Sequence, residues 1–153
     1  MSLVSEIPNM LTQPPNDGNL AIDIDPGRIA CAQHNAQVYG VADRIDFILG
    51  DFFQLIPFLK ADVVFLSPPW GGPEYLDQSV FDLSRMGHLD GIDIFTRTSQ
   101  ITPNIAYFLP RNVDPAQLAQ LSDQCEMEGN YINDKLKTVT AYFGELKQAL
   151  APG

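Results

Sequence analysis

The segment from Ser67 to Pro73, with the sequence SPPWGGP, has the residues best suited to bind an aromatic ligand. Its adjacent prolines, Pro68 and Pro69, fix the backbone and lack N–H groups, so the carbonyl oxygens of Ser67 and Pro68 have fewer local donors to pair with. These carbonyls and the Ser67 hydroxyl can accept hydrogen bonds from an amino group, while the indole of Trp70 can stack on a ring. The segment therefore suits a flat ring that carries an amino group. A rigid connector with Trp70 packed in the core is the alternative, because proline and glycine are also common in turns.

The elements around this segment alternate between strands and helices, which predicts a parallel α/β sheet. We expect strands at residues 20–25, 45–49, 63–66 and 105–109, and helices at residues 28–39, 54–59, 93–100 and 114–121. Residues 79–86 are expected to add one or two helical turns. The chain closes with an antiparallel hairpin, whose strands are residues 126–132 and 137–143 and whose loop is residues 133–136.

The composition indicates one globular domain rather than a disordered chain. Its hydrophobic content of 45% and charged content of 18% are ordinary for a chain of 153 residues that buries a core. Residues 1–18 contain three prolines and little periodicity, so we predict an extended leader there. The domain itself is expected to span residues 19–150.

The charge and the cysteines exclude several classes of function. A net charge of -10 argues against binding of long duplex nucleic acid through its phosphates, because no basic stripe is present to release counterions. Recognition of one nucleotide by stacking and hydrogen bonds remains compatible with this charge. Cys31 and Cys125 follow no metal-ligand spacing, so we expect no metal site and a reducing intracellular compartment. No apolar run is long enough to cross a membrane.

Polar residues lie at the ends of three of the predicted strands, and the carboxyl ends of parallel strands meet in one crevice. Asp23 lies near the end of the first strand and suits the two hydroxyl groups of a ribose, because a carboxylate can accept from both. Ile24 would then lie against an adenine ring. Asp51 could accept a hydrogen bond from the adenine amino group, with Phe52 beside it.

Simpler roles exist for the aspartates. Asp25 precedes Pro26 and is expected to cap the helix that follows. An aspartate at the end of a strand is often only a turn former, and this alternative applies to both Asp23 and Asp51.

Four stretches of the chain, residues 21–52, 58–75, 101–112 and 133–146, resemble the trimethylguanosine synthase family of class I S-adenosylmethionine-dependent methyltransferases. The most specific parts are SPPWGGP and the YFLPRN motif at residues 107–112. Members of this family methylate the exocyclic N2 of 7-methylguanosine caps on small nuclear and nucleolar RNAs. The resemblance implies a Rossmann-like, mostly parallel sheet with a C-terminal antiparallel hairpin, and a site of action in the nucleus or cytoplasm.

The resemblance also implies a role for each candidate residue, with S-adenosylmethionine as cofactor and 7-methylguanosine-capped RNA as partner. The cofactor would contact Asp23, Ile24, Asp51 and Phe52. Ser67 and Pro68 would hold the N2 amine, and Trp70 would stack on the methylated guanine. The remaining cap contacts would come from Pro73, Arg111 and Asn112, with Arg111 at the phosphates. A 7-methylguanine ring is cationic, so its stacking on Trp70 gains a cation–π term.

One part of the family's fold has no counterpart in the sequence. Class I methyltransferases open with a strand, a G-x-G-G loop and a helix, whereas residues 1–19 contain Gly18 as their single glycine. In the family's sheet the missing strand lies between strands 20–25 and 63–66, so we expect two unpaired edges there and self-association through them. Two alternatives stay open: an incomplete or inactive cap-binding or interaction module, and an enzyme that methylates the amino group of another RNA or DNA base.

Overall fold

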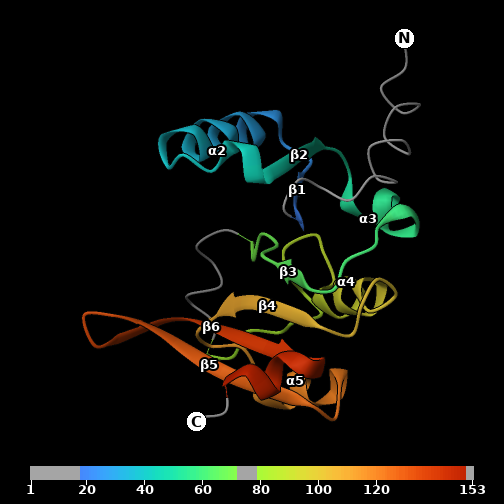
Figure 1. Cartoon of the computed structure of the whole chain (residues 1–153). Coiled ribbons are helices and arrows are strands. Elements are labelled where there is room, and N and C mark those ends of the chain that lie inside the picture. The colour runs from blue at the N-terminus through green and yellow to red at the C-terminus, as the bar shows by residue number, and fades with distance from the viewer. Residues whose placement is uncertain (1–17, 72–78, 151–153) are drawn as a thin grey trace. The chain divides into compact units, whose positions relative to one another are not determined.

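A computed structural model describes residues 18–71 and 79–150 of the chain (Figure 1). The chain divides into two compact units, which are residues 1–60 and residues 61–153. Apart from Gly18, the expected leader lies outside the described residues. None of the described helices has the length and apolar character that crossing a membrane requires.

The first unit is a parallel strand pair whose strands are joined by a helix. Strands β1 (Asn19–Asp23) and β2 (Ile45–Leu49) pair in parallel, and α2 (Pro26–Val38) forms the crossover between them. Helix α2 begins at a proline that needs no N–H partner and is followed by Gly40, whose φ of 68° suits a residue without a side chain. The predicted β-α-β order is therefore confirmed.

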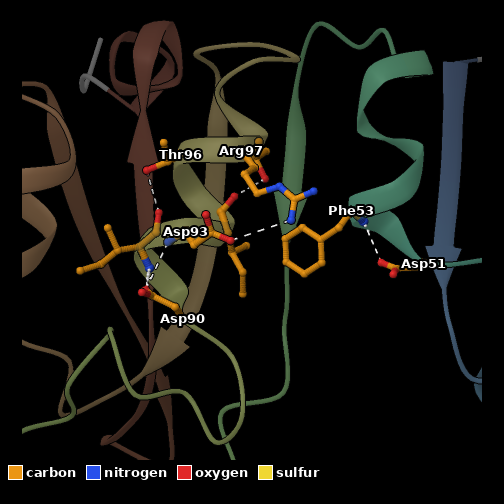
Figure 2. A network of polar contacts seen from close by, with 9 residues as sticks. Asp51, Phe53, Asp90, Asp93, Thr96 and Arg97 are labelled. Carbon is orange, nitrogen blue, oxygen red and sulfur yellow. Dashed lines mark hydrogen bonds and ion pairs between the residues drawn. The ribbon is translucent and has the colours of Figure 1, made fainter.

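The two α-helices described in the first unit each follow an aspartate that caps their free N–H groups. The Asp25 carboxylate accepts hydrogen bonds from the N–H groups of Gly27 and Arg28 at 2.7 and 3.2 Å, so its predicted capping role is confirmed. Helix α3 (Phe52–Leu55) is capped in the same way by Asp51, as Figure 2 shows. The 3-10 turn η4 (Ile56–Phe58) continues α3, so the predicted helix begins two residues earlier than expected.

The second unit is built on a mixed sheet of strand order β3-β4-β6-β5 (Figure 1). Its strands are β3 (Val64–Leu66), β4 (Ile105–Pro110), β5 (Cys125–Ile132) and β6 (Lys135–Phe143). The pair β3-β4 is parallel, and the other pairs are antiparallel. The hairpin turns on two residues, Asn133 and Asp134, whose φ values of 50° and 59° are typical of a type I′ turn. The predicted hairpin is confirmed, although its second strand starts two residues earlier.

One face of this sheet holds the core of the second unit. Alternate residues of β4 and β6 share this face and are buried: Ile105, Tyr107, Leu109, Val139, Ala141 and Phe143. Ala106 and Thr140, which alternate with them, are buried as well. Helix α4 (Gly91–Thr98) packs against this face, since the rings of Phe95 and Phe143 are 4.5 Å apart and the Tyr107 hydroxyl donates to the Gly91 carbonyl at 3.0 Å. Burial raises the pKa of Tyr107. Helix α5 (Pro115–Leu121) adds the fully buried Leu118.

Helix α4 is also fixed by local polar contacts, which Figure 2 shows. Its cap, Asp90, accepts from the N–H groups of Ile92 and Asp93 at 2.8 and 3.2 Å. One turn further along, Asp93 forms an ion pair with Arg97 at 3.9 Å. An i,i+4 pair of this orientation stabilises a helix by a few tenths of a kcal/mol. The predicted helix over residues 93–100 is confirmed, with its start moved back to Gly91.

Within the described residues, β1 pairs with β2 alone and β3 pairs with β4 alone. Among the described residues, β1 and β3 therefore each have one unpaired edge, as expected. Beside the free edge of β3, the side chains of Val63 and Phe65 are 49% and 63% exposed. Exposed apolar side chains next to unpaired backbone groups are unusual in a complete α/β sheet.

The prediction of helical turns over residues 79–86 is wrong. The N–H groups of Leu83 and Ser84 bond to side chains, and that of Phe81 bonds to the distant carbonyl of Asn112, so no helical ladder forms. The Asp82 carboxylate accepts from both the N–H and the hydroxyl of Ser84, at 3.0 and 2.8 Å. The N–H of Leu83 donates to the side-chain carbonyl of Gln117 at 2.7 Å. Such side-chain partners compete with helix formation.

Candidate functional site

The two predicted cofactor carboxylates follow neighbouring strands at the same end of the first unit's sheet. Asp23 ends β1 in register with Leu49, and the Gly50 N–H donates to the Asp23 carbonyl at 3.0 Å. Asp51 comes directly after Gly50. The parallel pairing of β1 and β2 therefore brings both carboxylates to one edge of the sheet, as the sequence predicts.

The Asp23 carboxylate can both stabilise the turn and bind a ligand, because its two oxygens have different surroundings. One carboxylate oxygen accepts from the N–H of Asp25 at 2.8 Å, and this hydrogen bond shapes the turn. The other oxygen lies 3.9 Å from the Arg28 guanidinium, a distance that makes this ion pair weak and leaves the oxygen open to other donors. The neighbouring Ile24 is 68% exposed, which is unusual for isoleucine beside a carboxylate. An exposed apolar side chain next to a carboxylate suits a ligand with a flat ring and a polar sugar.

Asp51 is more fully occupied than Asp23. One of its carboxylate oxygens caps α3 by accepting from the Phe53 N–H at 2.9 Å, and the other accepts from the side-chain amide of Gln54 at 3.3 Å. Phe52 beside it is half-buried, and its ring centroid lies 6.0 Å from that of Phe53. Asp51 therefore has a structural role of its own in addition to the predicted one.

The Ser67–Trp70 loop leaves β3 at its carboxyl end, where it meets β4. The Trp70 indole N–H donates to the carbonyl oxygen of Phe108 at 3.1 Å, and the two rings lie 5.4 Å apart at an angle of 34°. Phe65 of β3 adds a third ring, 6.3 Å from Phe108. Trp70 is half-buried, so its indole is anchored on the sheet and still partly open to solvent. Ser67 is exposed and Pro68 half-buried.

The predicted phosphate-binding residue follows the neighbouring strand. Arg111 comes directly after β4 and is exposed, and Asn112 after it is half-buried. Because β3 and β4 run in parallel, Arg111 and the Ser67–Trp70 loop leave the same end of the sheet. Trp70 and Arg111 thus follow the same end of two neighbouring strands of the second unit. Pro73, a further predicted contact, lies outside the described residues.

The structure adds Lys137, a cation that sequence reasoning did not single out. The last pair between β4 and β6 joins Pro110 to Thr138, so Arg111 and Lys137 are the residues that follow this pair, one on each strand, at the same edge of the sheet. Both are exposed. Lys137 falls at the register shift of the hairpin, where β5 passes from pairing with Thr138 to pairing with Leu136. Two cations at this edge suit an anionic ligand better than one.

Residues 81–89, which we call the bridge segment, contact both the end of the tryptophan loop and the turn after Arg111. Gly71, with a φ of 100°, and Gly87, with a φ of 62°, approach so closely that a Cβ atom on Gly71 would lie 3.6 Å from the backbone of Gly87. At its other end, the Phe81 N–H donates to the carbonyl of Asn112 at 2.7 Å. The bridge segment therefore positions the end of the tryptophan loop and the turn after Arg111 together.

The candidate residues form two sets, one in each unit. The first set offers carboxylate oxygens and an exposed apolar side chain, which can bind a nucleoside. The second set offers an anchored indole, proline-flanked carbonyls and two cations, which can bind a phosphorylated aromatic base. Among the described residues, no three side chains of histidine, cysteine, aspartate or glutamate come together as metal ligands do.

Comparison with known proteins identifies the family. Residues 17–146 match the family model described as RNA cap guanine-N2 methyltransferase. The chain is 41% identical over 106 residues to the trimethylguanosine synthase of Schizosaccharomyces pombe and 41% identical over 105 residues to that of Saccharomyces cerevisiae. Each match covers 65% of this chain, but 44% of the first protein and 33% of the second. The matched region thus spans less than half of either yeast protein.

Solved structures agree with the predicted fold. A methyltransferase domain described as the delta-N METTL16 MTase domain matches 81% of this chain and 61% of its own, with a TM-score of 0.53 and 13% sequence identity. At that identity the likeness shows the fold alone, which is the α/β fold of class I methyltransferases. With the family model matched over most of the sequence, the chain belongs to the RNA cap guanine-N2 methyltransferase family.

Proposed function

We propose that this chain carries the methyltransferase core of an enzyme that transfers methyl groups from S-adenosylmethionine to the exocyclic N2 of 7-methylguanosine caps, producing trimethylguanosine caps on small nuclear and nucleolar RNAs. The observation that supports this most strongly is the anchored Trp70 at the end of a Ser-Pro-Pro loop, at the same sheet edge as Arg111. That combination offers a ring platform, amine acceptors and a phosphate partner.

The cap base would stack on Trp70. Methylation at N7 makes the guanine ring cationic, so the indole face gains a cation–π attraction of about 0.5–2 kcal/mol in addition to stacking. The hydrogen bond from Trp70 to Phe108 holds the indole in one orientation before the base arrives. Less conformational entropy is then lost on binding. A neutral base would forgo the electrostatic part of this attraction.

The exocyclic amine is a poor nucleophile, because its lone pair is delocalised into the ring. Carbonyl oxygens from Ser67 and Pro68, and the Ser67 hydroxyl, would accept hydrogen bonds from its protons. Such acceptors favour a more tetrahedral nitrogen and stabilise the positive charge that develops on the amine during attack. This mechanism requires no general base with a shifted pKa.

The residues of the first unit fit S-adenosylmethionine, which supplies an electrophilic methyl group on a sulfonium when it is bound. Asp23 has one carboxylate oxygen outside the turn that it stabilises, and this oxygen can accept from a ribose hydroxyl. The exposed Ile24 can cover one face of the adenine, and Phe52 with Asp51 can bind its edge. These contacts would orient the cofactor without taking part in the chemical step.

The cap phosphates would lie against Arg111 and Lys137. Both residues are exposed, and each comes directly after the last pair of β4 and β6. A guanidinium and an ammonium can together neutralise adjacent phosphates, and charge-assisted hydrogen bonds of this kind are about twice as strong as neutral ones. The acidic remainder of the chain would limit contacts to long duplexes.

The proposal also covers the extent of the domain, its location in the cell and its self-association. Residues 19–150 would act as one methyltransferase domain behind a leader of residues 1–18, in the nucleus or cytoplasm. The unpaired edges of β1 and β3 would support self-association, which sedimentation at several protein concentrations tests. A single sedimenting species of constant mass would remove that part of the proposal.

The direct test is a transfer assay with S-adenosylmethionine labelled on its methyl group. We expect label on N2 of a 7-methylguanosine-capped RNA and none on the same RNA capped with unmethylated guanosine. Mapping of the label by nuclease digestion and mass spectrometry locates the methylated atom. Label on an adenine amino group would instead support the alternative of an enzyme for another base.

Cap binding without methyl transfer is the second candidate function. The distribution of the residues favours it, because Trp70, Arg111 and Lys137 all belong to the second unit, which has its own sheet and core. This set could bind a cap without any help from the carboxylates of the first unit. Cap affinity that is unaffected by the cofactor, together with no label transfer, would support this candidate.

A further inference from the structure

The side chain of Gln117, on α5, joins that helix to the bridge segment. Its carbonyl oxygen accepts a hydrogen bond from the Leu83 N–H at 2.7 Å, and its amide N–H donates to the Asp82 carboxylate at 2.8 Å. Both polar groups of this side chain are therefore used on the bridge segment. The next residue of α5, Leu118, is fully buried, so the helix that carries Gln117 is fixed to the core. The proposed function assigns no cap or cofactor contact to α5.

Leu83 of the bridge segment is held from both sides. Gln117 binds its N–H, and its carbonyl oxygen accepts from the Gly91 N–H, at the start of α4, at 2.8 Å. A Cβ atom on Gly91 would lie 2.7 Å from that carbonyl oxygen, so a residue without a side chain is needed for this approach. The side chain of Leu83 is itself fully buried. The bridge segment is therefore fixed in position at this residue.

A tight turn leads from this fixed point to the tryptophan loop. The backbones of Met86 and Leu89 exchange two hydrogen bonds of 2.9 Å, and the side chain of Met86 is buried. Gly87 is the first residue between them, and its φ of 62° is typical of a type II′ turn. A Cβ atom on Gly87 would lie 3.4 Å from Cα of Gly71, the residue directly after Trp70. The bridge segment thus packs against the end of the loop that carries the indole.

The turn after Arg111 is confined by the same segment. On one side, the Phe81 N–H donates to the Asn112 carbonyl at 2.7 Å. On the other side, the chain continues from this turn into α5, which Gln117 ties back to the bridge segment. The turn is therefore closed on two sides by contacts with one segment. Because that segment also packs on the end of the tryptophan loop, it sets where the loop and the turn lie relative to each other.

This relative position matters for a ligand that has to reach both places at once. In a cap, the base would stack on Trp70 while the phosphates of the same molecule lie against Arg111. The second contact of such a ligand gains from the first only if the spacing of the two places matches that of the ligand. A shift of either place loses this gain, although each place keeps its affinity for its own half of the ligand.

We propose that Gln117 is a positioning residue, which sets the spacing between Trp70 and Arg111 by holding the bridge segment. This inference rests on the proposed function, because that function supplies the ligand that spans both residues. Gln117 acts through the bridge segment and not on the ligand itself. Its loss therefore weakens the binding of ligands that need both places and spares those that need one.

The test is calorimetry on the full chain with three probes: 7-methylguanosine for the base, inorganic triphosphate for the phosphates, and 7-methylguanosine triphosphate for both. The two half-ligands are titrated at millimolar concentration. Gln117→Met nearly keeps the length of the side chain and removes both hydrogen bonds. We expect it to bind 7-methylguanosine triphosphate about fivefold or more weakly than the parent, and to bind each half-ligand with unchanged affinity.

Asn104→Leu is the matched control, because Asn104 is also half-buried and also joins distant segments of the second unit. Its carbonyl oxygen accepts from the Glu145 N–H at 2.9 Å, and its amide N–H donates to the Asp62 carbonyl at 3.1 Å. It precedes β4, at the end of the strand opposite to Arg111. We expect Asn104→Leu to lower the unfolding temperature as Gln117→Met does, and to leave all three affinities unchanged.

Three results would overturn the inference while the cap site stands. The first is an affinity of Gln117→Met for 7-methylguanosine triphosphate equal to that of the parent. The second is an equal loss for all three probes, which would assign Gln117 to general stability. The third is an equal loss in Asn104→Leu. If the parent binds 7-methylguanosine triphosphate no more tightly than 7-methylguanosine, the inference and the phosphate role of Arg111 both fall. If the parent binds none of the probes, the proposed function falls with them.

Discussion

Trp70 and Phe108 are joined both by a hydrogen bond, from the indole N–H to the Phe108 carbonyl at 3.1 Å, and by ring contact at 5.4 Å. The carbonyl belongs to β4, the strand that also delivers Arg111. The indole is therefore fixed relative to the cation and does not simply extend from a loop. This relationship makes Trp70 both a structural anchor and the proposed cap platform, and the two roles can be separated by substitution.

Trp70→Ala is expected to weaken binding of a 7-methylguanosine cap analogue tenfold or more, which corresponds to about 1.4 kcal/mol. The reason is the loss of both stacking and the cation–π term. Cofactor affinity should change little. Trp70→Phe keeps a ring on Phe108 but loses the hydrogen bond, so it should fall between the parent and the alanine variant. Calorimetry with the cap analogue measures all three, and an unchanged affinity in Trp70→Ala would contradict the stacking role.

Asp23→Ala is expected to weaken binding of S-adenosylhomocysteine while cap affinity stays near that of the parent. Asp25→Ala is the matched control, because it removes a carboxylate two residues away that caps α2. Loss of that cap should cost about 1 kcal/mol of stability without a comparable loss of cofactor affinity. Thermal unfolding and calorimetry on both variants separate the roles. Equal cofactor binding by Asp23→Ala and the parent would remove the ribose assignment.

Arg111→Gln and Lys137→Gln are each expected to lower the affinity for a triphosphate cap analogue about fivefold and to affect the 7-methylguanosine nucleoside hardly at all. The salt dependence of triphosphate binding should become shallower in both variants, because fewer counterions are released. Lys147→Gln, a change at an exposed cation of the same unit, serves as control. Equal losses for nucleoside and triphosphate would argue against phosphate contact.

Asp82→Asn tests the bridge segment through pH. Hydrogen bonds from Gln117 and then Ser84 hold the pKa of Asp82 below its usual value. A carboxylate with a lowered folded-state pKa contributes stability above its unfolded pKa of about 3.9, and that contribution is lost as pH falls through the folded pKa. The parent should therefore melt above Asp82→Asn at about pH 7, and this gap should shrink below about pH 4. A gap that is constant across that range would contradict the assignment.

Local patterns of the sequence were sufficient for most of the fold. The proline and glycine that bound α2, the asparagine and aspartate of the hairpin turn, and the apolar runs of the strands all act over a few residues. The bridge segment escaped prediction because a residue 35 positions away, Gln117, bonds to Asp82. No local periodicity contains that information.

The candidate site was likewise predictable only where local sequence motifs define it. The tryptophan loop and Arg111 are visible as motifs, and parallel pairing brings them to one edge. Lys137 is different, because its place at the same edge as Arg111 depends on the register between β4 and β6. A hairpin predicted only to within two residues cannot supply that register.

The central claim is that this chain binds both a cofactor and a cap, and calorimetric titration of the 153-residue protein tests it most directly. The first titrant is S-adenosylhomocysteine, and the second is a 7-methylguanosine triphosphate cap analogue, with unmethylated guanosine triphosphate as control. We predict saturable binding of the first two and at least tenfold weaker binding of the control. Failure of the chain to bind either S-adenosylhomocysteine or the cap analogue would contradict the account.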